Sequence, residues 1–332
     1  MPHSKAILIG CGYFSRIHLD AWQRLKDRVT ITALCDIEPA AAQARAAEYG
    51  IERTYTDFHS ALHREQPDFV DIVTRPALHG PIVRAAADRG IPSFCQKPLA
   101  PTFAECQELA AYCAQRHVRL MVNENWRWQA WYRELKRLLN AGTIGEPHYA
   151  TLRHRVADGV GSAPYPKQPY CAAMPRFLLI ETMLHFVDTA RFLMGDLALH
   201  SALMHRANSH IAGEDMVVLN CTTPSGAICV IDGNRVSRAE HEGPVSGDAR
   251  IEGSTGTLSL LGDGSIVIRP HTGDPIAHTY PIPGIGYRGD SAYSVHRHFL
   301  DALQFHQPFE TDAADNLQTM HIVEEAYRQA GR

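Results

Sequence analysis

No stretch of the sequence reaches the roughly 18 uninterrupted apolar residues of a membrane-spanning helix, so we expect no such helix. Blocks of consecutive Lys and Arg are also missing, and the formal net charge is −4. Both features argue against a nucleic acid or an anionic membrane as partner. The first residues, MPHSKAILIG, lead directly into a short apolar run, so we expect no signal peptide. Small molecules are therefore the expected ligands.

The eight cysteines form no CxxC pair, and several of them stand inside apolar runs. A chain of 332 residues does not need disulfide bonds to stabilise a small core. The pattern predicts buried, reduced thiols and a cytoplasmic protein. The same length exceeds the size at which one hydrophobic core usually keeps growing, so two domains are expected.

Apolar runs alternate with Ala-rich helical segments over the first 123 residues. The runs lie at 6–10, 29–36, 69–74, 91–95 and 118–123. Gly50 and Gly90 stand where helices between the runs are expected to end. Because parallel strands need a crossover connection, this alternation predicts a doubly wound parallel sheet, a Rossmann domain, over residues 1–123.

The pattern changes after residue 123. Residues 216–234 are typical of a hairpin that turns at Pro224–Gly226, and residues 249–270 are typical of a meander. Helices are expected at 131–141, 177–194, 291–306 and 313–329. We therefore predict an α/β protein whose second domain, residues 124–332, is of the α+β type with a large, predominantly antiparallel sheet.

A glycine-bearing turn follows the first apolar run directly. Residues 10–15, GCGYFS, have a GxGxx pattern with the small residue Ser15 in place of a third glycine. Such glycines allow a tight turn and bring the N–H groups of the next helix close to a pyrophosphate. The alternative is a glycine turn without a ligand.

An acidic residue ends the second run. Asp36 follows Gly12 by 24 residues, where a carboxylate accepts hydrogen bonds from ribose hydroxyls. A carboxylate at this point repels a 2′-phosphate, so NAD is favoured over NADP. The alternative is that Asp36 caps the helix that begins near Pro39.

Polar residues end the last three runs. These residues are Thr74, Arg75 and His79, then Gln96 and Lys97, then Asn123 to Trp128. Parallel sheets bind ligands beyond the carboxyl ends of their strands, so Lys97 is expected on the cofactor side. The alternative is an ordinary solvated lysine before a proline that starts a helix.

One polar stripe interrupts an apolar helix of the second domain. Glu181, His185 and Asp188 fall at positions i, i+4 and i+7, where a carboxylate can fix the imidazole tautomer of a general base. The alternative is a core histidine with satisfied hydrogen bonds. A metal is not expected, because this helix has no second histidine at metal spacing and no cysteine pair supports one.

Several motifs together resemble the Gfo/Idh/MocA family over nearly the whole chain. They are the glycine turn followed by His18, a TxPxxH-like segment at 74–79, Lys97-Pro98, an NxRW-like segment at 125–128, and the helix at 181–188. The resemblance implies an NAD(P)-dependent oxidoreductase acting on CH–OH groups of sugars or polyols. The segments NENWRWQ, DGVG, QPY and MPRF look similar to a branch of aldose dehydrogenases.

The resemblance also implies roles for individual residues. Lys97 corresponds to the family's catalytic lysine, His185 to its catalytic histidine, and Glu181 to a catalytic acid that is usually aspartate. The predicted cofactor residues are Gly10, Gly12, Tyr13, Phe14, Asp36, Thr74, Arg75, His79, Gln96, Lys97 and Asn125. The predicted substrate residues are Trp126, Arg127, Trp128, His154, Arg155, Arg176 and His185.

Three departures from the family pattern bear on the site. Gln96 replaces a glutamate that contacts the nicotinamide ribose, and an amide still donates and accepts hydrogen bonds there. Arg176 stands where the family often has a run of glycines, and Glu181 is one methylene longer than aspartate. The identity of the substrate therefore does not carry over from the family.

The predicted reaction is reversible hydride transfer between a substrate carbinol and the nicotinamide, with His185 taking the hydroxyl proton and Lys97 stabilising the oxyanion. Two other functions remain open. One is a dinucleotide-binding sensor without turnover, and the other is a lyase or glycosidase that uses bound NAD transiently. An open sheet face also predicts a homodimer or homotetramer.

Overall fold

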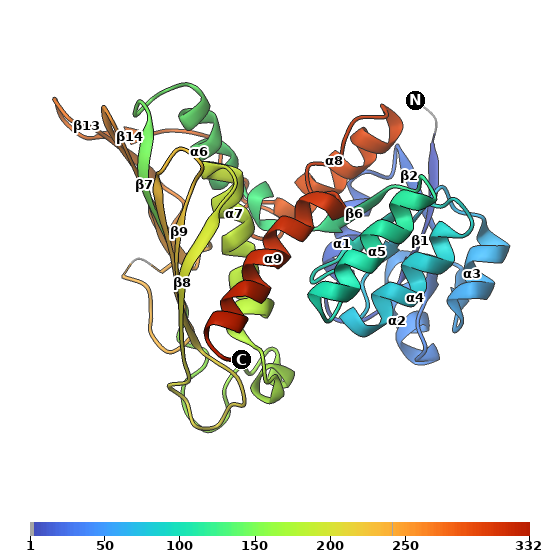
Figure 1. Cartoon of the computed structure of the whole chain (residues 1–332). Coiled ribbons are helices and arrows are strands. Elements are labelled where there is room, and N and C mark those ends of the chain that lie inside the picture. Colours follow the sequence, from blue (N-terminus) through green and yellow to red (C-terminus); the bar gives the residue numbers. More distant parts are fainter. Residues whose placement is uncertain (1–2, 241) are drawn as a thin grey trace. The chain divides into compact units, whose positions relative to one another are not determined.

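The computed structural model describes residues 3–240 and 242–332 (Figure 1). Packing divides the chain into two compact units: unit 1 is Met1–Asn125 with Ile285–Leu317, and unit 2 is Trp126–Gly284 with Gln318–Arg332. This division differs from the expected continuous domains 1–123 and 124–332, because the segment Ile285–Leu317 returns to unit 1. No local pattern signals this return, since the helix in the segment has an ordinary amphipathic sequence.

Unit 1 contains the predicted doubly wound parallel sheet. Its strands are β1 (Ser4–Ile9), β2 (Val29–Cys35), β3 (Arg53–Tyr55), β4 (Phe69–Ile72), β5 (Ser93–Gln96) and β6 (Leu120–Asn123). They are ordered β3-β2-β1-β4-β5-β6, and every pairing is parallel. Its helices are α1 (Ser15–Gln23), α2 (Pro39–Tyr49), α3 (Phe58–Glu65), α4 (Pro76–Ala87), α5 (Phe103–Gln115) and α8 (Ser291–Gln304). The carboxyl ends of all six strands therefore lie along one edge.

Local sequence signals begin and end these helices. Asp57 accepts hydrogen bonds from the first N–H groups of α3, and Thr102 forms a capping box with Glu105 at the start of α5. Gly50 ends α2 in the left-handed conformation that favours glycine. These caps fix where the helices begin and end, as the alternation of strands and helices in the sequence predicts.

Helix α8 completes the core of unit 1. The Phe299 ring lies 4.9 Å from the rings of both Phe69 and Phe94, which belong to β4 and β5. Its distance from the Trp22 ring is 6.5 Å. Aromatic pairs at these separations are attractive beyond the area that they bury. The segment that returns from the far end of the chain is therefore part of the Rossmann core.

Unit 2 contains an eight-stranded mixed sheet. Its strands are β7 (Pro147–Arg155), β8 (Ala198–His205), β9 (Met216–Thr222), β10 (Ile228–Asn234), β11 (Gly247–Gly253), β12 (Gly256–Leu260), β13 (Ile266–Pro270) and β14 (Ile276–His278). They are ordered β14-β13-β12-β11-β7-β10-β9-β8. Among these described strands, β7 and β10 pair in parallel and the other neighbours are antiparallel. The predicted antiparallel character is confirmed, including the hairpin between β9 and β10.

Helices cover one face of this sheet. They are α6 (Ala130–Asn140), α7 (Leu184–Met194) and the later part of α9 (Ala313–Gln329), as Figure 1 shows. The face against the helices is buried, whereas alternate side chains on the other face are partly exposed, as in the pattern of β9. This alternation is the one expected of a sheet with a single covered face.

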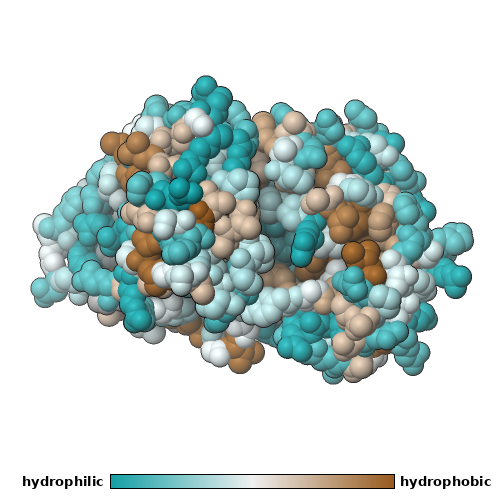
Figure 2. Space-filling model, turned by 90° about the horizontal axis from the view of Figure 1, so that it is seen from below, coloured by the Kyte–Doolittle hydropathy of each residue, from teal (hydrophilic) through white to brown (hydrophobic). Residues whose placement is uncertain are grey.

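The thiols agree with the expectation from composition. All eight cysteines are free and buried, and burial raises the pKa of Cys11 and of Cys35 to about 12. No helix among the described residues is both long enough and apolar enough to cross a membrane. On the face shown in Figure 2, hydrophobic residues form separate patches among hydrophilic ones.

Candidate functional site

The glycine turn after β1 has the geometry of a phosphate-binding turn. Gly10 has a φ of +102°, and a Cβ atom added there would lie 2.5 Å from the Val73 carbonyl oxygen. A Cβ atom added to Gly12 would have no described atom within 4 Å, and no described side chain caps the N-terminus of α1. Gly10 is thus required for the turn itself, whereas the space at Gly12 and the uncapped N–H groups suit an anion.

A serine and an arginine brace this turn. The Ser15 hydroxyl donates to the Gly12 carbonyl oxygen at 2.6 Å, and Arg45 Nε donates to the Ser15 hydroxyl at 3.1 Å. Arg45 also pairs with Glu48 on the same helix, α2. The residue that replaces the third glycine is therefore part of a hydrogen-bonded support. Sequence reasoning missed Arg45, because only the fold brings α2 beside the turn.

Asp36 lies at the end of β2 and holds two backbone N–H groups. Its two carboxylate oxygens accept from Cys11 N at 2.6 Å and from Glu38 N at 2.9 Å. The first bond fixes the glycine turn, and the second orders the start of α2, so the alternative of a capping role has support. Each oxygen keeps a further lone pair, which fits the ribose hydroxyls of a dinucleotide.

Other predicted cofactor residues surround the same strand ends. Tyr13 is 77% exposed in the glycine turn, and the Phe14 ring lies 5.7 Å from the His18 ring. The buried ring of His79 lies with Nδ1 3.0 Å from the Pro98 carbonyl oxygen and Nε2 3.0 Å from that of Thr74. Burial lowers the pKa of His79. Its ring therefore orders the two loops rather than presenting a charge to a ligand.

Three more of the predicted cofactor residues lie in unit 1. Arg75 is the residue that precedes α4, and Asn125 is buried two residues after β6. Lys97 follows β5 directly and is partly exposed, with a cis peptide bond to Pro98. The strand that precedes Lys97 is separated from β1 by β4 alone, so the glycine turn and the lysine share one edge of one sheet.

A fully buried cluster lies beneath these strand ends. His18 Nδ1 lies 2.9 Å from Asp71, and Asp71 also accepts from the Trp22 indole at 2.7 Å. His296 Nε2 lies 4.0 Å from the same carboxylate. His18, Asp71 and His296 are near enough together to ligate a metal. Hydrogen bonds already use the Asp71 oxygen that faces both histidines, so this cluster fits a hydrogen-bond network better than a cation site.

In unit 2, three of the predicted residues form an aromatic cluster. The His185 ring stacks on the Trp126 indole with centroids 4.8 Å apart and an angle of 5°. His154 lies edge-on to the same indole at 6.3 Å, and both histidines are nearly buried. The structure therefore brings Trp126, His154 and His185 together from η1 (Trp126–Trp128), β7 and α7. Because Trp126 is 4% exposed and also packs against Phe186, the stack holds the His185 ring in a fixed orientation.

The helix that carries Glu181 is not a regular α-helix. Residues Leu179–Met183 form a π-helical turn before α7 begins at Leu184. The predicted α-helical stripe of Glu181, His185 and Asp188 therefore does not hold at its first member, because the wider turn changes the angular offset. A π turn gives no distinct signal in the sequence.

Glu181 belongs to a polar cluster with a residue that the sequence did not indicate. Its Oε2 accepts from the Thr182 hydroxyl at 2.6 Å and lies 3.9 Å from Arg235 Nη1. Arg235 is buried and donates to Asp158 at 2.8 Å. Burial opposes the charge, but the bond with Asp158 raises the pKa of Arg235 above its usual value. Arg235 follows β10, and only the sheet order brings it to Glu181.

Two arginines and a tryptophan predicted to contact substrate have partners within unit 2. The nearly buried Arg127 donates to both carboxylate oxygens of Asp188, with Nε 2.7 Å from Oδ2. Arg155 pairs with Asp232 across the parallel strands β7 and β10. Arg127 and Arg155 each have a carboxylate partner within unit 2, and their substrate role stays a prediction. The Trp128 ring likewise stacks with the Arg133 guanidinium at 3.5 Å.

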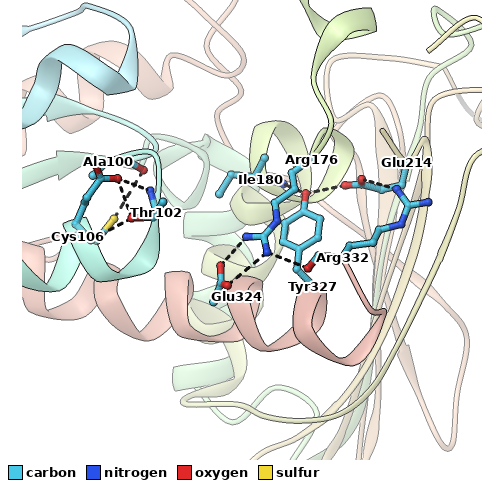
Figure 3. A network of polar contacts seen from close by, with 10 residues as sticks. Ala100, Thr102, Cys106, Arg176, Ile180, Glu214, Glu324, Tyr327 and Arg332 are labelled. Atoms are coloured by element: carbon cyan, nitrogen blue, oxygen red, sulfur yellow. Dashed lines mark hydrogen bonds and ion pairs between the residues drawn. The ribbon is translucent and has the colours of Figure 1, made fainter. Parts of the chain in front are cut away.

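Arg176 belongs to a network at helix α9, shown in Figure 3. Its Nη1 donates to Glu324 at 2.8 Å, and its guanidinium lies 4.5 Å from the centre of the Tyr327 ring. The Tyr327 hydroxyl donates to Glu214 at 2.7 Å. This network ties α9 to the segment before α7. The bulky cation at the expected glycine run thus has a structural partner in this chain.

Known proteins resemble this chain over almost its whole length. Residues 4–124 match the family "Oxidoreductase family, NAD-binding Rossmann fold", and residues 132–259 match the "GFO/IDH/MocA C-terminal domain". A D-apiose dehydrogenase of Paraburkholderia graminis is 37% identical, covering 98% of this chain and 87% of the relative. A D-apiose dehydrogenase of Rhizobium rhizogenes is 32% identical, covering 99% and 96%.

A solved structure shows the same fold. An oxidoreductase from Agrobacterium radiobacter, in complex with NAD+, L-tartaric acid and magnesium, superposes with a TM-score of 0.92. It is 30% identical, and the match covers 99% of this chain and 97% of that one.

Proposed function

Because the chain belongs to the Gfo/Idh/MocA family of NAD-binding oxidoreductases, we propose that it is an NAD-dependent dehydrogenase that oxidises a CH–OH group of an aldose, with D-apiose as the first substrate to test. The substrate rests on the similarity to two D-apiose dehydrogenases over nearly the whole chain. Polyols are the second class of substrate, as the sequence analysis predicts.

The observation that carries this proposal is the common edge of the unit 1 sheet. The glycine turn follows β1, Asp36 follows β2, and Lys97 follows β5, all at the carboxyl ends of parallel strands. A dinucleotide bound along this edge has its pyrophosphate at α1 and its adenosine ribose at Asp36. The nicotinamide end then lies toward the later strands, where Lys97 is found.

The residues present fit NAD. Gly10 leaves no room for a side chain, the described part of the chain puts no side-chain cap on α1, and Asp36 offers lone pairs to ribose hydroxyls. The nicotinamide supplies the carbon that accepts the hydride. A 2′-phosphate would meet the Asp36 carboxylate, so we propose NAD rather than NADP. Equal kcat/KM with the two cofactors would contradict this assignment.

Two side chains act on the substrate in the proposed reaction. As the carbinol C–H leaves as hydride, the hydroxyl loses its proton and the carbon becomes a carbonyl carbon. His185 accepts that proton, and the Lys97 ammonium stabilises the negative charge that develops on the oxygen. Glu181 is the proposed catalytic acid by its correspondence with the family's acid, and its described contacts are with Thr182 and Arg235. Both roles follow from the correspondence with the family's catalytic residues.

Turnover of the whole protein with NAD and a panel of aldoses and polyols tests the proposal. Absorbance at 340 nm should rise with D-apiose or a related aldose, because the reduced nicotinamide absorbs there. A protein that forms no NADH but cleaves C–O bonds would instead be a lyase or glycosidase. Binding of NAD without any product would indicate a sensor. Either outcome would overturn the dehydrogenase proposal.

Substitutions test the assigned roles. His185→Ala should lower kcat by about 10² to 10⁴, the usual contribution of a general base, while NAD still binds. Lys97→Ala should lower kcat by about 10² to 10³, the usual effect of losing one oxyanion donor. The exposed residues His200 and Lys5 provide matched controls, and their alanine variants should keep wild-type kcat. Normal turnover of Lys97→Ala would reduce the lysine to a positional role.

The open face of the unit 2 sheet supports a homodimer or homotetramer. Ile228 is 48% exposed on β10, and Val230 and Val218 are partly exposed beside it on β10 and β9. A second copy of the chain commonly covers apolar residues on an open sheet face. Val230→Lys should convert the oligomer to monomers in light scattering after gel filtration. A monomeric wild-type protein would contradict the proposal.

The buried free cysteines favour the reducing environment of the cytoplasm as the compartment of the protein. Cell fractionation tests this assignment, and recovery of the protein with disulfide bonds from an oxidising compartment would contradict it.

A further inference from the structure

Gln96 lies at the end of β5, with its side chain 7% exposed and turned toward the buried cluster around His18. Its carboxamide nitrogen lies 2.7 Å from His18 Nε2, and its carboxamide oxygen accepts from the Lys97 backbone N–H at 3.2 Å. Both ends of one amide are therefore used, one by the histidine and one by the residue that we assign to catalysis.

The partners of His18 fix its tautomer. Nδ1 faces both oxygens of Asp71 at 2.9 and 3.0 Å, and a carboxylate only accepts, so Nδ1 carries a proton. Nε2 faces the amide nitrogens of Gln96 and, at 3.0 Å, of Asn123. Amide nitrogens only donate, so Nε2 carries a lone pair. His18 is therefore a neutral imidazole with its proton on Nδ1.

The groups that face this imidazole come from several elements of unit 1. Asp71 on β4 and His296 on α8 are the titratable ones among the described contacts, and Phe14 and Phe94 provide the remaining rings. The His18, Asp71 and His296 side chains are fully buried. Burial, with His18 as a neighbour, keeps the pKa of His296 well below 6.5. Among the described side chains of this cluster, Asp71 is thus the single charge.

From these contacts we propose that Gln96 is a positioning residue, whose carboxamide joins the buried Asp71–His18 pair to the backbone of Lys97 and so fixes the start of the catalytic lysine. This inference rests on the proposed function, since it gives Lys97 its catalytic role. The amide is required because it donates to His18 and accepts from Lys97 at the same time. A carboxylate at position 96 accepts only.

The amide also limits the charge in the core. With glutamate at position 96, a carboxylate would lie about 2.7 Å from His18 Nε2 and would require an imidazolium. Three buried charges, on the introduced carboxylate, His18 and Asp71, would then replace one, and each buried ion is costly to desolvate. Glutamine therefore supports Lys97 without adding a charge to the buried cluster.

Two substitutions separate the parts of this inference. Gln96→Leu keeps nearly the same side-chain volume and removes both hydrogen bonds, so kcat should fall on the order of 10- to 100-fold through displacement of Lys97. KM for the sugar should stay within about threefold, because the residues proposed to contact the sugar remain. Gln96→Glu should also lower kcat, because a carboxylate cannot donate to the lone pair of His18 Nε2.

Asn123→Leu is the matched control. It removes the other amide nitrogen that faces His18 Nε2, at 3.0 Å, and leaves the contacts of Gln96 with His18 and with the Lys97 backbone in place. This variant should leave kcat at neutral pH within about threefold. An equal loss of kcat in Asn123→Leu and Gln96→Leu would show general disturbance of the core, and it would overturn the positioning role.

The ¹⁵N NMR spectrum of the wild-type His18 ring tests the tautomer without turnover. A neutral ring protonated on Nδ1 from about pH 6 to 8 is expected, and an imidazolium at about pH 7 would overturn the assignment. A protein that oxidises no sugar would end the proposed function while the tautomer result stands. Wild-type kcat and pH profile in Gln96→Leu, with Lys97→Ala inactive, would end this inference alone.

Discussion

Replacing Arg127 by Met should destabilise unit 2 by about 3–5 kcal/mol, the usual cost of removing one partner from a buried ion pair. Arg127 and Asp188 have side-chain exposures of 6% and 0%, and the guanidinium binds both carboxylate oxygens. Without the arginine, the buried Asp188 carboxylate would lose both charge-assisted hydrogen bonds from the guanidinium. The expected loss is therefore that of a stranded charge.

The double variant Arg127→Met with Asp188→Leu distinguishes a stranded charge from lost packing. Replacing both members of a buried pair by apolar residues is often nearly neutral, so the double variant should recover most of the stability. Arg176→Met is the exposed control, because Arg176 and Glu324 are each 40% exposed. A pair of that kind contributes about 0.2–1 kcal/mol.

Urea unfolding followed by tryptophan fluorescence measures these differences as free energies of unfolding. Three of the four tryptophans, Trp126, Trp128 and Trp131, belong to unit 2. The midpoint for Arg127→Met should fall well below that for Arg176→Met, and a Trp22→Phe background removes the signal of unit 1. An unchanged midpoint with a strongly raised KM for the sugar would refute the reasoning. It would return Arg127 to the substrate role that the sequence predicted.

Three further results are expected. Gly10→Ala should abolish NAD binding in calorimetry, because its Cβ would lie 2.5 Å from the Val73 carbonyl oxygen, and measurable binding would contradict the close approach. Ser15→Ala should raise Kd for NAD with kcat nearly unchanged, because it removes the hydroxyl that joins Arg45 Nε to the Gly12 carbonyl oxygen. Ser15→Gly is the comparison, and equal Kd in both variants and in the wild type would exclude a brace. Burial depresses the pKa of His296 in the folded protein. Above about pH 6.5 the ring is neutral in both the folded and the unfolded chain, so it does not reduce stability. Below that pH the unfolded chain binds the proton more readily, and the free energy of unfolding falls by up to about 1.4 kcal/mol per pH unit. His296→Gln should flatten the dependence of the unfolding free energy on pH between about 5 and 6.5, and an unchanged slope would refute the assignment.

The parts of the fold that local pattern determines were predictable from the sequence. Alternating apolar runs and capped helices predict the parallel sheet, and the glycine turn with Asp36 marks its nucleotide end. The residues at the strand ends, Gln96 and Lys97 among them, follow from the same pattern.

What the sequence did not reveal depends on distant partners. Arg127 meets Asp188 across 61 residues and Arg176 meets Glu324 across 148, so neither arginine could be told from a substrate ligand by its neighbours in the chain. Arg235 is a similar case, since only the sheet order brings it to Glu181. The π turn at Leu179–Met183 has no distinct signal in the sequence. The amide of Gln96 was expected at a ribose, and its contact with His18 depends on partners far away in the chain.

The return of Ile285–Leu317 to unit 1 has a consequence for synthesis of the protein. During translation the nucleotide-binding sheet leaves the ribosome early, but Phe299, which stacks on Phe94, is made only after all of the described strands of unit 2. Domains usually fold as units in the order of their synthesis. Here the Rossmann core must wait, partly uncovered, until about nine-tenths of the chain exists, and we expect the nascent protein to depend on chaperones during that interval.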